Sequence, residues 1–183
     1  MTETKQANSA WSALRPVLVL LLICLVAGAL LGWVHDLTAP VAEANEQEKA
    51  RLIYEELVPD AESFEELNCS VEGCTAALAA QDAQGNTVAY VIVAQSKGYG
   101  GQVPIAVAFG PEGNVLSITA MANDETPGLG TKVANESYIG QYVDQPAQPL
   151  TADDVDLISG ATISSKAVLA AFNCAVEAYE EVR

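Results

Sequence analysis

A short segment of the sequence, Asp-Leu-Ile-Ser-Gly-Ala-Thr at residues 156–162, carries the side chains best suited to covalent chemistry. Thr162 stands at a turn that opens a predicted helix, and Gly160 gives the backbone the freedom that such a turn needs. Ser164 and Ser165 follow, and we expect their hydroxyls to cap the helix. Because a helix N-terminus presents unpaired N–H groups and a partial positive charge, it stabilises a phosphate group. Taken alone, the segment fits either a phosphate-binding turn at Thr162 or ordinary capping, which is the commoner use of Ser and Thr before a helix.

Two further segments are rich in glycine, Gly98-Tyr99-Gly100-Gly101 and Glu125-Thr126-Pro127-Gly128-Leu129-Gly130. Taken alone, the first is compatible with a bulge where a strand begins. The second is compatible with a turn in which Pro127 fixes φ and Gly128 takes a positive φ. Glycines also have a chemical use, because a backbone without side chains can approach a flat ring and donate N–H groups to it. Both segments are thus candidates for contact with a planar ligand.

Together the three segments resemble the FMN-binding domain family of membrane redox complexes, in which Asp-x-x-Ser/Thr-Gly-Ala-Thr is the flavinylation motif. The resemblance implies that Thr162 carries FMN through a phosphoester bond, attached by a flavin transferase that uses FAD. It implies that Asp156 assists recognition by the transferase or orients the loop. The turn around the acceptor would be shaped by Ser159, Gly160 and Ala161.

The resemblance also implies contacts with the flavin from the glycine-rich segments. The residues expected to bind the cofactor there are Tyr99, Gly100, Glu125, Thr126, Gly128 and Leu129, of which the last four would flank the isoalloxazine. Tyr99 would either stack on the ring or pack against the protein. Lys166, one turn into the helix, would either pair with the phosphodiester charge or remain solvated.

Within that family the chain is most similar to the G subunits of Rnf complexes, which are ion-translocating ferredoxin:NAD oxidoreductases. This implies an electron-transfer subunit without independent turnover, whose partners are the other membrane subunits. The C subunit of the sodium-translocating NADH:quinone reductase is an alternative, because it shares the motifs. That subunit is usually longer, so the short length of this chain favours the Rnf G subunit. A free-standing extracytoplasmic flavoprotein is a second alternative. An acidic adhesion or scaffold domain would leave the segment at 156–162 unexplained.

The elements that would position these segments indicate an α+β domain with an antiparallel sheet and flanking helices. Alternating apolar residues predict one hairpin from strands at 75–80 and 87–94, and a second from strands at 103–109 and 115–121. A short helix is expected at 132–143, followed by a linker, and apolar spacing predicts a last helix at 164–182. An amphipathic helix at 38–58 is expected to precede the sheet.

An uncharged stretch of eighteen residues, 17–34, predicts a single membrane span. At 1.5 Å per residue it covers about 27 Å, close to the roughly 30 Å of a bilayer's hydrocarbon core. Trp11 and Trp33 lie near its ends, Lys5 and Arg15 precede it, and acidic residues follow it. The positive-inside rule then predicts a cytoplasmic tail at 1–16, a membrane-proximal helix at 35–60 and an extracytoplasmic domain at 61–183, held at the cell (inner) membrane. A cleavable signal peptide is the alternative, since Ala27-Gly28-Ala29 could serve as a weak cleavage site.

The charge balance excludes several classes of function. The chain has 24 acidic and eight basic residues and a net charge of −16, and the part after residue 16 has a net charge of −17. Nucleic-acid binding needs clustered cations, so we exclude it. One histidine and four cysteines are too few for the common His-rich metal centres, and we expect no metal.

The cysteines leave alternatives open. Cys69 and Cys74 bracket a loop of four residues in the exported domain, so they either form a disulfide or remain free thiols. Cys174 lies beside the apolar face of the last helix and is expected in the core. Cys24 lies in the span, where it would face lipid or pack against a neighbour.

Overall fold

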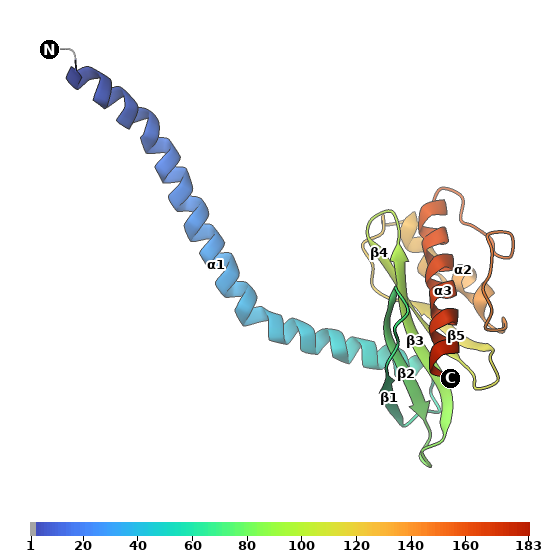
Figure 1. Cartoon of the computed structure of the whole chain (residues 1–183). Helices are drawn as coiled ribbons and strands as arrows, with labels where there is room; N and C mark the ends of the chain where they lie inside the picture. The colour runs from blue at the N-terminus through green and yellow to red at the C-terminus, as the bar shows by residue number, and fades with distance from the viewer. Residues whose placement is uncertain (1–2) are drawn as a thin grey trace. The chain divides into compact units, whose positions relative to one another are not determined.

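The computed structural model describes the backbone of residues 3–183 and the side chains of residues 14–39 and 45–183. The chain divides into two compact units, Met1–Ala50 and Arg51–Arg183. The second unit contains the whole sheet and the segments singled out above (Figure 1).

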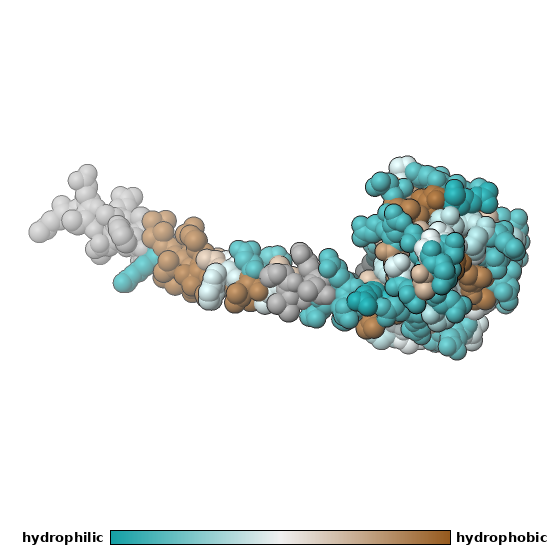
Figure 2. Space-filling model, turned by 90° about the horizontal axis from the view of Figure 1, so that it is seen from below, coloured by the Kyte–Doolittle hydropathy of each residue, from teal (hydrophilic) through white to brown (hydrophobic). Residues whose placement is uncertain are grey.

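The first unit is a single helix. Helix α1 runs from Glu3 to Leu57, so that its last turns belong to the second unit. Its apolar part, Leu14–Ala39, is 26 residues long, has no buried residue in its most apolar window, and is long and apolar enough to cross a membrane. Figure 2 shows this hydrophobic surface on α1, in contrast to the largely hydrophilic surface of the globular unit. The predicted span at 17–34 and most of the helix expected at 38–58 are parts of this one continuous helix. The side chain of Trp11 lies outside the described residues.

The second unit is built on a five-stranded antiparallel sheet in which every strand pairs with its neighbour in sequence. The strands are β1 (Ser63–Leu67), β2 (Cys74–Gln81), β3 (Thr87–Lys97), β4 (Gln102–Phe109) and β5 (Val115–Ala120). Both predicted hairpins are confirmed, as β2–β3 and β4–β5. Strand β1 was not predicted. The α+β class, with an antiparallel sheet and flanking helices, is confirmed.

The turns of the hairpins follow from their glycines and polar residues. In the β2–β3 turn, Gly85 has a φ of 81°, and the Asp82 carboxylate accepts hydrogen bonds from the N–H groups of Gln84 and Asn86. In the β4–β5 turn, Gly113 has a φ of 87°. Positive φ is accessible to glycine at little cost, so these sequences fix where the strands reverse.

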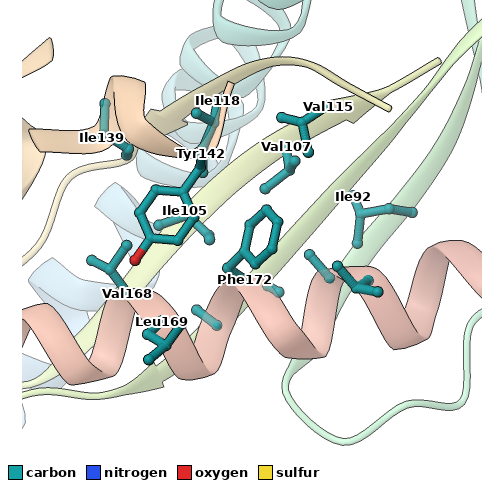
Figure 3. Packing of buried hydrophobic residues seen from close by; sticks show 14 of the residues in the cluster. Ile92, Ile105, Val107, Val115, Ile118, Ile139, Tyr142, Val168, Leu169 and Phe172 are labelled. Carbon is teal, nitrogen blue, oxygen red and sulfur yellow. The ribbon is translucent and has the colours of Figure 1, made fainter. Parts of the chain in front are cut away.

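One face of the sheet is covered by helix α3, Thr162–Val182, which packs across β3 and β4 and reaches β2. Its predicted apolar face is buried, with Val168, Ala171, Phe172, Ala175 and Tyr179 fully inaccessible. Figure 3 shows Phe172 and Tyr142 between this helix and strand residues such as Ile105 and Val107. This packing fixes the position of the N-terminus of α3, where Thr162 stands.

The other face of the sheet is covered by the end of α1. Leu57 and Val58 are buried against the small side chains of Ala80, Ala106 and Ala108, and Ile53 and Tyr54 pack at the edge of the same cluster. The Ser117 hydroxyl also donates a hydrogen bond of 2.7 Å to the carbonyl of Leu57. Residues 51–58 therefore belong structurally to the globular unit.

The segment between β5 and α3 carries two of the three motifs and is mostly irregular. The helix expected at 132–143 is instead three short pieces, η1 (Gly130–Ala134), α2 (Glu136–Ile139) and η2 (Gly140–Tyr142). The following stretch, expected to be a linker, is anchored: the Leu150 N–H and carbonyl each bond to the side-chain amide of Asn173 at 2.8 Å. These contacts hold the segment against α3.

Candidate functional site

The three segments meet at one cavity of about 520 Å³ in the globular unit, a volume typical of small-molecule sites. Tyr99 comes from the loop between β3 and β4, and the second glycine-rich segment contributes Glu125, Thr126, Leu129 and Gly130. The start of α3 and the turn before it contribute residues 160–164. Residues more than 60 positions apart in the sequence thus line the same space.

The turn that precedes α3 has a defined hydrogen-bond pattern. The Ala161 N–H donates to the Ile158 carbonyl at 3.0 Å, and Gly160 has a φ of 83°. The Ser165 hydroxyl donates to the Ala161 carbonyl at 3.0 Å and accepts the Ile158 N–H at 3.1 Å. Ser165 therefore holds both ends of the turn.

The expected capping by Ser164 and Ser165 is wrong. The N-cap position is Ala161, and in the described chain no side chain bonds to the free N–H groups there. Both serines lie inside the first turns of the helix, and their hydroxyls are used by other partners. The first N–H bonded within the helix is that of Ser165, to the Ala161 carbonyl. The N–H groups of the first turn thus remain available to an anion at the cavity.

The hydroxyls around this turn differ in accessibility. Ser164 and Ser165 are 2% and 0% exposed. Ser159 is exposed but does not line the cavity, whereas Thr162 is exposed and lines it. Of the four, only Thr162 combines an accessible hydroxyl with a place on the cavity wall.

Glu125 links the two glycine-rich segments to the first turn of α3 from inside. It is 3% exposed, and its carboxylate accepts hydrogen bonds from the N–H groups of Tyr99 (2.8 Å) and Gly100 (3.1 Å) and from the Ser164 hydroxyl (2.6 Å). Burial raises the pKa of this carboxyl, but the three hydrogen bonds outweigh burial and lower the pKa below its ordinary value. Sequence reasoning placed Glu125 beside a ligand ring and missed Ser164, because their contact spans 39 positions.

Glycines make room for this carboxylate. A Cβ at Gly98 or at Gly130 would collide with the Glu125 carboxylate oxygens, and one at Gly100 would collide with the Asp124 carbonyl. Gly128 differs, because it has open space around it and a φ of 76°. It is the third residue of a turn closed by the hydrogen bond from the Leu129 N–H to the Thr126 carbonyl, which confirms the turn expected at Pro127 and Gly128.

The rim of the cavity is apolar and exposed. Tyr99 is 72%, Leu129 48% and Ile163 56% exposed. Leu129 also approaches the backbone at Gly160, where a Cβ would lie 3.8 Å from its Cδ2. A flat apolar ligand could be covered by these side chains while its anionic end meets α3.

The remaining predicted residues lie outside the cavity wall. Lys166 is exposed on α3, and Asp156 is exposed with its N–H donating to the Gln141 side chain at 2.7 Å. Gly100, Gly128 and Ser159 are also absent from the lining. Neither Asp156 nor Lys166 makes an ion pair with a described residue.

The cysteines outside the span form a separate cluster of free thiols. The pKa of the Cys74 thiol is raised to about 12, mainly by burial. A hydrogen bond with the Cys69 thiol and the charges of Cys69 and Cys174 raise it further. Cys174 is only partly buried and donates to the Glu72 carbonyl at 3.2 Å. Among the described residues, no group of His, Cys, Asp and Glu side chains is arranged to hold a metal.

Comparison with known proteins gives consistent matches. Residues 98–177 match the FMN-binding domain family, and this range contains all three segments. The G subunit of a proton-translocating ferredoxin:NAD(+) oxidoreductase complex from Clostridium ljungdahlii is 35% identical over 185 residues, covering 97% of this chain and 95% of that protein. The G subunit of an ion-translocating oxidoreductase complex from Methanosarcina acetivorans is 30% identical, covering 88% and 91%.

Among solved structures, the crystal structure of NqrC from Shewanella oneidensis has a TM-score of 0.48 and 22% identity over 57% of each chain. The sequence match to the first relative extends over nearly the full length of both proteins. The chain therefore belongs to the G-subunit family of Rnf-type, ion-translocating ferredoxin:NAD oxidoreductase complexes, with an FMN-binding domain at residues 98–177.

Proposed function

We propose that this chain carries FMN covalently on Thr162 and transfers electrons between neighbouring subunits of an Rnf-type complex. The observation that carries the proposal is the convergence of the three segments on one cavity whose wall includes Thr162. The apolar rim and the uncapped N-terminus of α3 fit a flat ring with a phosphate at one end.

Attachment would transfer the FMN half of FAD to the protein. The Thr162 hydroxyl oxygen forms a bond to the flavin-side phosphorus, the pyrophosphate bond breaks, AMP leaves, and the hydroxyl proton is released. Thr162 is the first residue of α3, so the resulting phosphodiester charge would lie beside the free N–H groups and the positive end of the helix dipole. A flavin transferase is accordingly a partner during maturation.

The bound flavin would supply the redox chemistry, while the protein supplies position and electrostatic environment. Tyr99 and Leu129 would cover the ring at the rim, and Glu125 would hold the two glycine-rich segments against α3. The other membrane subunits of the complex would be the electron donor and acceptor. The helix Leu14–Ala39 would anchor the chain in the cell membrane.

The attachment site is tested by intact mass and by fluorescence in a denaturing gel, on full chain made together with the transferase. Thr162→Val keeps the shape of the side chain and removes the nucleophile, so both the added mass and the fluorescence should disappear. Thr126→Val is the matched control, because Thr126 also lines the cavity and is exposed. Flavin retained in Thr162→Val, or none on the parent protein, would refute the covalent assignment.

The orientation is tested independently. Arg15 before the span and the acidic excess after it support a cytoplasmic N-terminus and an extracytoplasmic domain. A reporter enzyme that works only outside the cytoplasm should be active when it is fused after Arg183. Activity of a strictly cytoplasmic reporter at the same position would reverse the topology and place the flavin on the other side.

A further inference from the structure

The Glu125 carboxylate is a buried charge that no other side chain of the described part of the chain neutralises. It lines the cavity and is 3% exposed. The ion pairs among the described residues are Arg51–Glu55 and Arg183–Glu180, and both are exposed. Its three hydrogen-bond donors are neutral groups. A full negative charge therefore faces the same space as Thr162.

The hydrogen bonds from the Tyr99 and Gly100 N–H groups do not by themselves require a charged side chain. In a glutamine, the amide oxygen could accept from the Tyr99 and Gly100 N–H groups, as Oε1 does now. The amide NH₂ could donate to the Ser164 oxygen, because a hydroxyl both donates and accepts. A glutamine thus has nearly the same shape, keeps both backbone hydrogen bonds and avoids the cost of burying a charge, but the Ser164 hydroxyl proton then loses its acceptor. The three hydrogen bonds stabilise the ionised form within the fold, and the same charge acts on any group bound in the cavity.

We propose that the negative charge of Glu125 lowers the reduction potential of the flavin held in this cavity. Reduction adds negative charge to the ring system, and a fixed carboxylate in a poorly solvated site opposes that addition more strongly than it would in water. This inference rests on the proposed function, since it needs a flavin on Thr162. It assigns to Glu125 the control of redox energetics, beyond its role in joining the three segments.

Glu181 offers a matched control for Glu125, because it lies on α3, the helix that also carries Ser164. Its carboxylate accepts hydrogen bonds from the Ser70 N–H at 3.2 Å and the Ser70 hydroxyl at 2.7 Å, so it also combines backbone and serine donors. It follows Ser164 by 17 residues, about 25 Å along the helix. Glu181→Gln therefore makes the same chemical change and removes the same charge far from the cavity.

The experiment uses the full chain in detergent, made together with the flavin transferase, with covalent flavin verified by mass. The midpoint potential is measured by a reductive titration followed through the flavin absorbance, and folding is checked by thermal unfolding. Glu125→Gln should shift the midpoint potential to a more positive value. Glu181→Gln should leave it at the parental value. Glu125→Asp, which keeps the charge, should lie closer to the parent than Glu125→Gln does.

Each result is decisive. A flavin-loaded, folded Glu125→Gln protein with the parental potential would overturn the inference, as would an equal shift in Glu181→Gln. If Glu125→Gln fails to fold, Glu125→Asp decides the question, because it keeps the charge: a folded, flavin-loaded Glu125→Asp protein with a potential far from the parental value would overturn the inference. Loss of covalent flavin from folded Glu125→Gln alone would assign the residue to attachment instead. Absence of flavin from the parent would refute the proposed function, which is a different failure.

Discussion

The Ser164 hydroxyl donates a hydrogen bond of 2.6 Å to the buried carboxylate of Glu125, and this contact joins the first turn of α3 to the glycine-rich loop. Two residues earlier on the helix, Thr162 lies on the wall of the cavity. The position of Thr162, the proposed FMN acceptor, is thus coupled to a side chain that belongs to a distant part of the sequence.

Ser164→Ala should lower the free energy of unfolding by about 1.5–3 kcal/mol, since it removes a hydrogen bond to a buried charged group. Ser70→Ala removes an equivalent serine–carboxylate contact, with Glu181, at an exposed site and should cost less than about 1 kcal/mol. Urea denaturation of residues 51–183, which contain the whole core, measures both. Equal losses would mean that burial of Glu125 adds nothing to the contact.

The stability of the domain should depend on pH through Glu125. Its pKa is depressed in the folded protein, so its contribution is present above the unfolded value near 4.5 and is lost as the pH falls through the folded value. Glu125→Gln should remove this component, so that the difference in unfolding free energy between parent and variant shrinks from about pH 6 towards about pH 3. A difference that stays constant over this range would contradict the depressed pKa.

Tyr142→Phe should leave the domain equally or more stable. The Tyr142 hydroxyl is buried and makes no hydrogen bond of acceptable geometry with a described residue, although burial and then the nearby Tyr138 hydroxyl raise its pKa, and such a group costs about 1–3 kcal/mol. Tyr179→Phe is the contrast, because that hydroxyl donates to the Gly110 carbonyl at 3.0 Å and its loss should cost about 0.5–1.5 kcal/mol. Each substitution removes only the hydroxyl and keeps the aromatic ring in place. A larger loss in Tyr142→Phe than in Tyr179→Phe, measured by urea denaturation, would contradict this assignment.

Gly128→Ala should destabilise the domain by about 1–2 kcal/mol, because an L-residue is strained at a φ of 76° even where space is open. Gly140 also has open space, but its φ is −62°. Gly140→Ala should therefore stabilise by about 0.4–1 kcal/mol, since it restricts the unfolded chain without strain. Thermal unfolding of the two variants gives opposite shifts if the backbone angle is the cause.

The parts of the fold that could be predicted are those with local signals. Gly85 and Gly113 mark the hairpin turns, and alternating apolar residues mark the strands beside them. Strand β1 escaped prediction because its sequence, Ser-Phe-Glu-Glu-Leu, is short and charged, and only its pairing with β2 makes it a strand. The segment 130–142 has a helical composition, but Asn135 leaves the helical region with a ψ of 138° and divides it.

The site was predictable only in outline. The motif at 156–162 identifies Thr162 from the sequence, and the cavity brings it together with Tyr99, Glu125, Thr126 and Leu129. The roles of the two serines were not predictable, because Ser164 bonds to a residue 39 positions away and Ser165 bonds back to the preceding turn. Local sequence favours capping for both, and tertiary contacts override it.

The sequential order of the strands has a consequence for biosynthesis. Each strand pairs with the one made just before it, so the sheet can form progressively as the chain is synthesised. Its main apolar face, including Ile92, Ile105, Val107 and Phe109, remains uncovered until α3 has been made. The same helix begins with Thr162, the proposed FMN acceptor. A nascent or truncated chain that lacks α3 would therefore be aggregation-prone and would also lack the proposed attachment site, so completion of the fold and cofactor loading would both wait for the last helix.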